Sequence, residues 1–449
     1  MSDLDLARLE AILREVAAAH PASGFGVAAF AAGRVLEVAT GTANPELDLP
    51  MTTDTLVQIG SSTKLLNAAL VMRLVELEVL DLDQPVRKVV DGFRLADDFA
   101  TDVLTLRHCL TMTSGLDGGP YEDLGGDQGH LARYVALLAD IPQLFPPGTG
   151  YGYGNASALV AGLAAECATG RAWDALLQEH IVQPAGLEHT LTTADQLMYH
   201  RVAVGIDPEG SVIRPWYLSR SMGPAGSTCA STAGDLVRFV RRVLSGGPDG
   251  GEPAVLSADT VRLMSESAVE VPTGFPAEAW GLGVGRTEVG GQVILGHPGF
   301  NQSGCSVVWW VPGLDVAVAC VANSPMAFPA VLDCANAVLA ELGCPLPQRP
   351  EITESALDDA ADAVGVYENL HLRYEVTVDG DGLELVVAPR GDLYGAGTTT
   401  HLRPAGRFGW LPEQPMMPGF TVPQPFAFLD YGGARVLLDG HEPARRVRE

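Results

Sequence analysis

Positive charge is scarce in this chain, and lysine is almost absent. The 449 residues include 28 lysines and arginines against 55 aspartates and glutamates, which gives a formal net charge of −27. A chain without a basic surface cannot neutralise phosphates, so neither nucleic acid nor an anionic membrane is an expected partner. The two lysines are Lys64 and Lys88, and every other residue in the basic count is an arginine.

The sequence also lacks an apolar run long enough to cross a bilayer. The most apolar late stretch, 307–321, is broken by Pro312, Gly313 and Asp315, which predicts two strands and a turn. The first 16 residues predict an amphipathic helix and do not have the pattern of a secretory signal. Seven cysteines, odd in number and without a pairing pattern, lie mostly among apolar residues. We therefore expect reduced, buried thiols and a cytoplasmic protein.

Hydrophobic periodicity predicts a sheet interrupted by a helical region. Alternation predicts a hairpin over 24–40 and later strands over 280–287, 292–297, 306–310 and 316–322. Helical spacing predicts helices over 62–79, 131–139, 156–168, 172–180, 233–244 and 329–342. Strands at both ends of a helical middle predict one α/β layer that the chain leaves to build an all-helical subdomain before it returns.

A proline cluster predicts the end of this first domain. Pro345, Pro347 and Pro350 stiffen the chain where the periodicity changes, so we divide it into domains 1–346 and 352–449. A short helix is expected over 354–363. Two alternating segments follow, 374–378 and 383–387, joined by an Asp-Gly-Asp-Gly turn. They predict a hairpin that opens a small antiparallel sheet or barrel.

The strongest chemical signal is the sequence Ser61-Ser62-Thr63-Lys64 at the start of an apolar helix. One helical turn separates Ser61 from Lys64, so both side chains face the same way beside the helix N-terminus. A serine nucleophile needs a base, and burial can lower the pKa of a lysine far enough to supply one. Arginine could not lose its proton at this position, which gives the rare lysine added weight.

Two further motifs could contribute to the same site. The first is the glycine-rich segment 147–155, which offers the phenol of Tyr153 and the amide of Asn155 at the start of a helix. The second is His297-Pro298-Gly299 at the end of a predicted strand. Taken singly, each has a structural explanation, since glycine-rich turns with an asparagine cap and lone histidines are common.

Together and in this order, the three motifs resemble those of the penicillin-binding protein and serine β-lactamase superfamily, class C-like members included. Ser61 and Lys64 match its first motif, 153–155 its Tyr-x-Asn, and 297–299 its His-x-Gly variant of Lys-Thr-Gly. The resemblance covers about residues 15–342. It implies an α+β fold, in which an antiparallel sheet is flanked by helices and joined to an all-helical subdomain. The small β domain that follows is similar to a lipocalin-like one.

The resemblance also implies roles for individual residues. Lys64 would deprotonate Ser61, Tyr153 would carry the proton to the leaving group, and Asn155 would bind the substrate amide. The backbone N–H groups of Ser61 and Phe300 would form the oxyanion hole, beside Gly299 and His297. Further candidates for substrate binding are Trp216, in the loop 212–227, and Arg446, one of three arginines in the terminal tail with Arg445 and Arg448.

The histidine at position 297 is a departure from Lys-Thr-Gly, whose lysine in this superfamily binds the carboxylate of penicillins. It disfavours β-lactam hydrolysis and favours esterases, D-aminopeptidases, amidases and the standalone thioesterases that cyclise nonribosomal peptides. The chain as a whole is most similar to these penicillin-binding-protein-type thioesterases. That resemblance implies a peptidyl thioester or D-residue peptide as substrate and a peptidyl carrier protein as candidate partner.

Other classes have less support. No Gly-x-Ser-x-Gly surrounds Ser61, and residues 281–286 miss the dinucleotide-binding fingerprint at its last position. No His-Glu-x-x-His or Cys-x-x-Cys occurs, so we expect no metal and no cofactor. A catalytically inactive relative that serves as a binding protein is the non-enzyme alternative, which the intact Ser61, Lys64 and Tyr153 disfavour.

Overall fold

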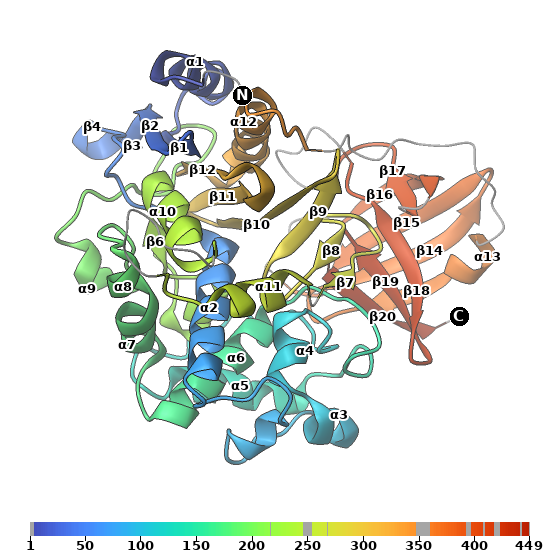
Figure 1. The fold of residues 1–449 in the computed structure, drawn as a ribbon. Coiled ribbons are helices and arrows are strands. Elements are labelled where there is room, and N and C mark those ends of the chain that lie inside the picture. The colour runs from blue at the N-terminus through green and yellow to red at the C-terminus, as the bar shows by residue number, and fades with distance from the viewer. Residues whose placement is uncertain are drawn as a thin grey trace.

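The chain folds into an α+β domain followed by a β-barrel (Figure 1). The computed structural model describes residues 4–215, 217–245, 254–266, 268–346, 360–391, 397–406, 409–416, 423–440 and 442–448. Within these ranges, no helix has the length and apolar character needed to cross a membrane.

An eight-stranded antiparallel sheet forms the centre of the first domain, in the order β2-β1-β12-β11-β10-β9-β8-β7. The strands are β1 (Phe25–Ala31), β2 (Arg34–Thr40), β7 (Val269–Glu270), β8 (Ala279–Trp280), β9 (Gly285–Val289), β10 (Gln292–Asn301), β11 (Gly304–Val311) and β12 (Val316–Ala322). Strand β1 pairs with β12, so the two ends of the domain lie side by side. Two separate two-stranded sheets accompany it, β3 (Thr42–Asn44) with β4 (Leu49–Pro50) and β5 (Val57–Gln58) with β6 (Ala230–Ser231).

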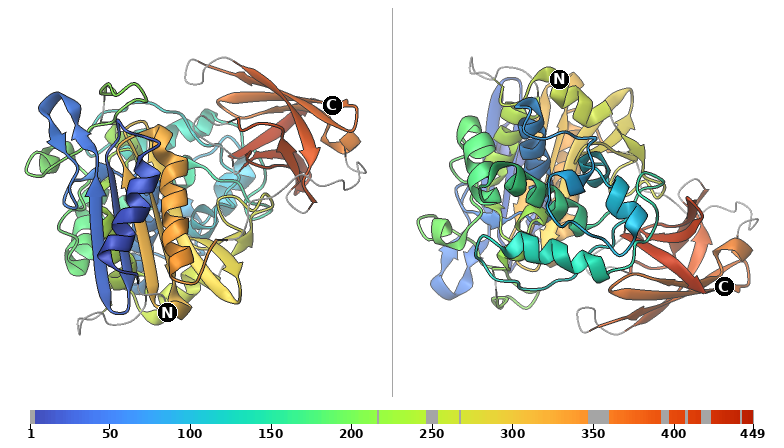
Figure 2. Two further views of the ribbon diagram at one scale, coloured as in Figure 1. Left: turned by 90° about the horizontal axis from the view of Figure 1, so that it is seen from above. Right: turned by 90° about the horizontal axis from the view of Figure 1, so that it is seen from below.

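Both faces of the sheet are covered by helices. On strand β11, Val307 and Trp309 pack on one face, whereas Val308 and Trp310 pack on the other, as the two-residue period of a strand requires. Helices α1 (Leu6–Ala17) and α12 (Phe328–Glu341) cover the first face, where Figure 2 shows them side by side. Helices α2 (Thr63–Glu76) and α10 (Ala233–Val243) cover the second.

The helical subdomain is built by the chain between β5 and β7, and it packs around α2 and α6. Apart from α2, its helices are mostly short, because glycine and proline interrupt the sequence often. They are α3 (Asp98–Val103), α4 (Leu106–Leu110), α5 (His130–Leu137), α6 (Asn155–Thr169), α7 (Trp173–Leu177), α8 (Gln183–Ala185), α9 (Ala194–Leu197) and α11 (Ala258–Glu266).

The second domain is a closed eight-stranded barrel with its own core. A short helix, α13 (Ala360–Ala363), precedes it. Its strands are β13 (Gly365–Glu368), β14 (Leu372–Asp379), β15 (Gly382–Pro389), β16 (Thr398–Pro404), β17 (Trp410–Pro412), β18 (Phe426–Tyr431), β19 (Ala434–Asp439) and β20 (Glu442–Arg448). Pairing of β13 with β20 closes the barrel. The predicted fold class, an α+β domain followed by a lipocalin-like barrel, is confirmed.

Several predicted boundaries were wrong in detail. The strand expected over 280–287 is two strands, β8 and β9, because Gly283 takes a positive φ of 78° between them. Strand β10 continues past the expected end at 297 to Asn301, and α2 begins at Thr63 and ends at Glu76, within the expected range 62–79. One of the seven thiols, Cys167, is exposed and not buried. Residues 347–359, which include most of the expected helix 354–363 and the predicted domain boundary, lie outside the described residues.

The barrel packs directly on the loop that carries the Tyr-x-Asn motif. A shared apolar cluster contains Phe145, Tyr151 and Tyr153 from the first domain and residues such as Tyr431 and Leu438 from the barrel. The rings of Phe145 and Tyr431 meet edge to face, with their centroids 5.0 Å apart. This contact fixes the position of the barrel relative to the motif.

Polar contacts add to this interface. The buried Asp117 carboxylate accepts a hydrogen bond from the backbone N–H of Leu370 at 2.8 Å. His371 Nε2 lies 2.9 Å from the carbonyl of Gly119, and the Arg445 guanidinium donates to the Gln143 carbonyl at 3.1 Å. The two domains therefore form one continuous packed unit.

We predict that Gly150→Ala loosens the barrel from the first domain. A Cβ at this position would overlap the Tyr431 ring, and overpacking of this kind costs about 1–3 kcal/mol. The melting temperature should fall, and hydrogen exchange should rise in residues 144–153 and 427–438. Gly391→Ala is the matched control, because a Cβ there meets no atom within 4 Å. Equal behaviour of the two variants would contradict the described interface.

Candidate active site

The candidate nucleophile Ser61 lies in a short 3-10 turn, Gly60–Ser62, that leads directly into helix α2. Ser61 is half-buried, whereas Lys64, one turn later, is buried. The Nζ of Lys64 lies 2.9 Å from the Oγ of Ser61. The local spacing expected from the sequence therefore places the two groups in hydrogen-bond contact.

Two glycines allow strand β10 to approach this turn closely. Gly60 has a positive φ of 53°, and a Cβ there would lie 2.5 Å from the Phe300 backbone nitrogen. On the opposite side, a Cβ at Gly299 would lie 2.7 Å from the backbone nitrogen of Ser61. A larger residue at either position would separate the strand from the nucleophile.

Hydrogen bonds hold the turn against the sheet. The Ser62 hydroxyl lies 2.7 Å from that of Ser306 on β11 and donates to the His297 carbonyl at 3.1 Å. Ser306 in turn donates to the carbonyl of Ile59 at 2.6 Å. Because Ser62 and Ser306 are fully buried, these bonds fix the nucleophile relative to β10 and β11.

Lys64 is surrounded by three oxygen atoms. Its Nζ lies 2.7 Å from the Asn155 Oδ1, 3.1 Å from the Ala225 carbonyl and 2.9 Å from the Ser61 Oγ. Burial lowers the pKa of Lys64 to about 7, although the nearby Glu442 carboxylate opposes part of this shift. A neutral amine has two N–H donors and one lone pair. It can donate to Asn155 and Ala225 while its lone pair accepts the Ser61 proton, which is the arrangement a general base needs.

Tyr153 lies on the other side of the nucleophile. Its hydroxyl hydrogen-bonds with Ser61, and Lys64 Nζ sits 4.7 Å from the centre of its ring. Burial raises the pKa of Tyr153, so the phenol is protonated at neutral pH and able to donate a proton. Asn155, the first residue of α6, also contacts Tyr121 through its Nδ2, 3.4 Å from the phenol oxygen.

His297 is buried among aromatic rings. Its imidazole meets the Trp280 ring edge to face with centroids 4.9 Å apart, and the Tyr153 ring lies 6.1 Å away. Trp280 also contacts Tyr153 directly, at 5.7 Å between centroids. The histidine thus helps to support the catalytic tyrosine candidate from the β10 side.

Phe300, Trp216 and Arg446 are the remaining residues predicted to bind substrate. The Phe300 backbone lies against Gly60, where an oxyanion-binding N–H is expected, while its side chain is 43% exposed. Trp216 lies outside the described residues.

Of the three C-terminal arginines, the structure does not bring Arg446 to Ser61. Its Nε faces the Arg448 carbonyl at 3.4 Å, and its charge acts on Tyr367 inside the barrel. Arg445, the neighbour on the outward face, contacts the first domain instead, through Gln143. Successive residues of a strand point to opposite faces, which separates these two neighbours.

Sequence reasoning missed several residues that surround the site. Tyr121 and Trp280 carry no motif, and Ala225 contributes only a backbone carbonyl. Glu442, from the barrel, raises the pKa of both Lys64 and Tyr153. A carboxylate in an arginine-rich tail gives no local signal of such a role, because its position depends on how the barrel docks.

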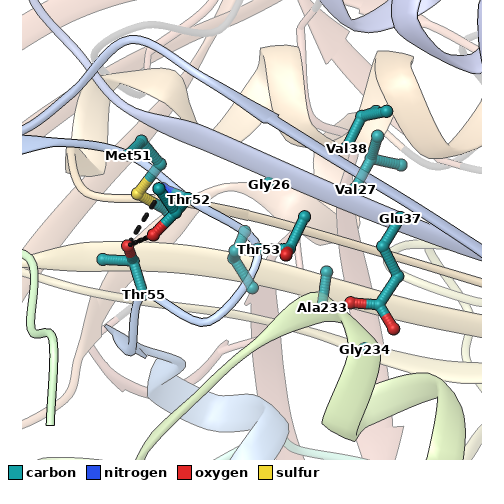
Figure 3. A pocket seen from close by; sticks show the side chains of 11 residues that line it. Gly26, Val27, Glu37, Val38, Met51, Thr52, Thr53, Thr55, Ala233 and Gly234 are labelled. Atoms are coloured by element: carbon teal, nitrogen blue, oxygen red, sulfur yellow. Dashed lines mark hydrogen bonds between the residues drawn. The ribbon is translucent and has the colours of Figure 1, made fainter.

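Two cavities elsewhere in the molecule include none of the motif residues. The one in Figure 3, of about 10 Å³, lies between β1, β2 and the start of α10, where the half-buried Glu37 carboxylate faces Gly234. It can hold at most one water molecule. The other, of about 300 Å³, is lined by Arg73, Glu179, His180, Pro184, Arg242, Ala254 and Val255.

One group of side chains in the described part of the chain has the spacing of metal ligands. Asp379, Glu384 and His401, on the barrel strands β14, β15 and β16, place their donor atoms within 4.8 Å of one another. Asp379 is exposed and the other two are half-buried. Exposed acidic groups of this kind are common without a metal, so the group supports no metal assignment.

We predict that labelling of Ser61 by a fluorophosphonate depends on the protonation of Lys64. The second-order rate constant should rise with pH through about 7, where Lys64 loses its proton, and stay level above it. Lys64→Arg should slow labelling by roughly 10²- to 10⁴-fold, since arginine remains charged. Lys88→Arg serves as the control at the other lysine. A Lys64→Arg rate close to that of the parent would show that Lys64 is a structural charge only.

We also predict that Gly299→Ala strongly impairs the site while the protein stays folded. The added Cβ would press on the backbone N–H groups of Ser61 and Ser62 and displace β10 from the nucleophile. Displacing one oxyanion donor costs roughly 10²- to 10³-fold in turnover. Ester hydrolysis and circular dichroism should be measured together. Normal turnover in this variant would rule out an oxyanion hole between Ser61 and β10.

Comparison with known proteins identifies the family. The sequence model of the Beta-lactamase family matches residues 9–341. Penicillin-binding protein 4 of Amycolatopsis lactamdurans is 33% identical over 364 residues, which cover 78% of this chain and 94% of that protein. The D-aminopeptidase of Gluconobacter oxydans (strain 621H) is 28% identical over 314 residues, 67% of this chain but only 55% of the relative.

Among solved structures, SurE is similar over nearly the whole chain. The crystal structure of SurE superposes with a TM-score of 0.80 at 25% identity and covers 98% of both chains, the barrel included. A second SurE structure, with D-Leu, has a TM-score of 0.79. The chain therefore belongs to the β-lactamase family, within the penicillin-binding protein and serine β-lactamase superfamily.

Proposed function

We propose that this protein is a standalone thioesterase that releases a nonribosomal peptidyl thioester with a C-terminal D-residue as a head-to-tail macrocycle. The superfamily to which it belongs consists of serine hydrolases and acyltransferases. The finer assignment is supported by the likeness to SurE, which extends over the barrel as well as the first domain and includes a structure with D-Leu. It is also supported by the resemblance of the chain to the penicillin-binding-protein-type thioesterases. The substrate would be delivered on a peptidyl carrier protein in the cytoplasm.

In the first step, Ser61 takes the peptidyl group. Neutral Lys64, 2.9 Å away, accepts the hydroxyl proton as Oγ attacks the thioester carbonyl. The carbonyl oxygen is stabilised by the backbone N–H groups of Ser61 and Phe300. The C–S bond then breaks, and the thiol leaves with a proton supplied through Tyr153. The products are an ester on Ser61 and a free carrier thiol.

In the second step, the peptide's own α-amine attacks this ester. The two ends are held in one molecule, so the attack benefits from a high effective molarity over water. The barrel packs beside the loop that carries Tyr153, and Ser61 remains half-buried. A partly enclosed acyl-enzyme favours the tethered amine over bulk water. Asn155 would orient the substrate amide during both steps.

A D-aminopeptidase, D-amino-acid amidase or esterase is the second candidate. The Gluconobacter oxydans D-aminopeptidase is a relative in sequence, and it would use the same acyl-enzyme. The difference lies in the acceptor, which would be water in place of a peptide amine. The buried His297, where relatives with a lysine bind a carboxylate, is compatible with both candidates but disfavours β-lactams.

The decisive experiment offers the protein a linear peptidyl thioester with a C-terminal D-residue. We expect a macrocycle as the main product by mass spectrometry, and little product from the matched peptide with a C-terminal L-residue. Ser61→Ala is the inactive control. Rapid cleavage of D-alanine p-nitroanilide without cyclisation of any thioester would transfer the assignment to the aminopeptidase.

A further inference from the structure

The hairpin β19–β20 of the barrel ends beside the catalytic residues. Asp439 and Glu442 face each other across the turn of this hairpin. The next residue, Pro443, packs on Gly152, where an added Cβ would lie 2.7 Å from the proline Cγ. The Pro443 carbonyl also accepts a hydrogen bond from the buried Asn369 at 3.2 Å. Glu442 is therefore fixed one residue away from a contact with the Tyr153 loop.

The alternation of β20 gives the direction of the Glu442 side chain. Ala444, two residues later, belongs to the barrel core, whereas Pro443 points outward to the first domain. Opposite Glu442, Asp439 hydrogen-bonds with the buried hydroxyl of Tyr374 at 2.9 Å, inside the barrel. Glu442 therefore lies on the inward face of the strand at the barrel end next to the active site. Arg446, on the same face, lies four residues or roughly 13 Å farther along the strand.

Glu442 interacts electrostatically with Lys64 and Tyr153. Its negative charge raises the pKa of Lys64 and of Tyr153. The pKa of Glu442 itself is raised to about 7, mainly because its carboxyl is removed from water and also because of Asp439 and Asp117, while Lys64 opposes part of the rise. Within the described part of the chain, no hydrogen bond or salt bridge engages this carboxylate. A carboxyl group in this state can gain and lose a proton near neutral pH.

In the proposed second step, no residue has yet been assigned to bind the attacking amine and take its proton. The amine that attacks the acyl-enzyme must be held near Ser61 and must lose a proton as its bond to the carbonyl carbon forms. Lys64 already contacts Asn155, Ala225 and Ser61 and cannot also bind a cationic group. An acceptor with negative charge at the edge of the site is what an incoming ammonium or amine would recognise.

We propose that Glu442 is the receptor and base for the amine nucleophile in the second step. This inference rests on the proposed acyl transfer to an amine. The peptide's neutral α-amine donates a hydrogen bond to the carboxylate and attacks the Ser61 ester. The N–C bond forms, the C–Oγ bond breaks, and one proton passes from nitrogen to Glu442. Ser61 Oγ takes a proton from Tyr153, which is restored from Glu442 through Lys64, so protons balance over the turnover.

The test compares Glu442→Gln with Glu375→Gln, an exposed glutamate of β14 in the same barrel. With the D-residue peptidyl thioester, thiol release reports acylation, and chromatography separates the macrocycle from the linear acid. Above pH 8 we expect Glu442→Gln to acylate within about threefold of the parent. Cyclisation should fall by on the order of 10²-fold. The acyl-enzyme should accumulate in intact-mass spectra, and the linear acid should become the main product.

Two further readouts complete the test. Glu442→Asp should recover part of the cyclisation, since it keeps the charge. Glu442→Gln should also move the rise of acylation with pH to lower pH, because the charge that raises the pKa of Lys64 is gone. Unchanged cyclisation, or equal losses of acylation and cyclisation above pH 8, would overturn the proposal.

A different substrate separates this inference from the proposed function. If no thioester is cyclised by the parent protein, the macrocyclase assignment fails, and the acyl-enzyme is then formed from an N-acyl-D-alanine nitrophenyl ester. Added glycinamide competes with water for this intermediate. Glu442→Gln should lower the ratio of aminolysis to hydrolysis at least tenfold, while Glu375→Gln should not change it. An unchanged ratio would overturn the role of Glu442 whatever the natural substrate is.

Discussion

The removal of the Lys64 amine from water is the constraint on which the rest of the site depends. A buried ammonium is costly unless it is paired, and the structure offers this one neutral oxygen atoms at short range with only a more distant carboxylate. Burial lowers the pKa of Lys64 to about 7, so that much of the amine is neutral near neutral pH. In the proposed mechanism burial therefore supplies the base, and the side chains that enclose Lys64 matter as much as the candidate nucleophile itself.

The enclosure is assembled from several separate parts of the chain. The 3-10 turn before helix α2 supplies the candidate nucleophile, α2 supplies the candidate base, the start of α6 supplies Asn155, and strand β10 closes the opposite side. The barrel packs on the segment that carries Tyr153, so the position of the phenol depends on a second domain. In this arrangement, domain docking and catalysis are coupled, which gives a physical reason for the likeness to SurE to include the barrel.

The inferred role of Glu442 extends the same reasoning to the acceptor. In the proposed mechanism the first domain forms the acyl-enzyme, whereas the choice between water and an amine requires a group that recognises the amine. A carboxylate on the barrel, at the end nearest Lys64, would make that choice a property of the second domain. Relatives that share only the first domain would then be expected to transfer their acyl group differently.

The sequence by itself determined the features that depend on neighbouring residues. The three-residue spacing of Ser61 and Lys64 fixed their contact through helix geometry, and alternation fixed most strands and the class of the fold. The motif resemblance placed Asn155 and His297 in the same site, but only the tertiary structure decided which atoms of these distant groups make contact. Asn155 reaches Lys64 from 91 positions away, and His297 contacts Ser62 across 235. Trp280 and Glu442 belong to no motif. They lie near the site because of sheet packing and domain docking, which local sequence patterns do not reveal.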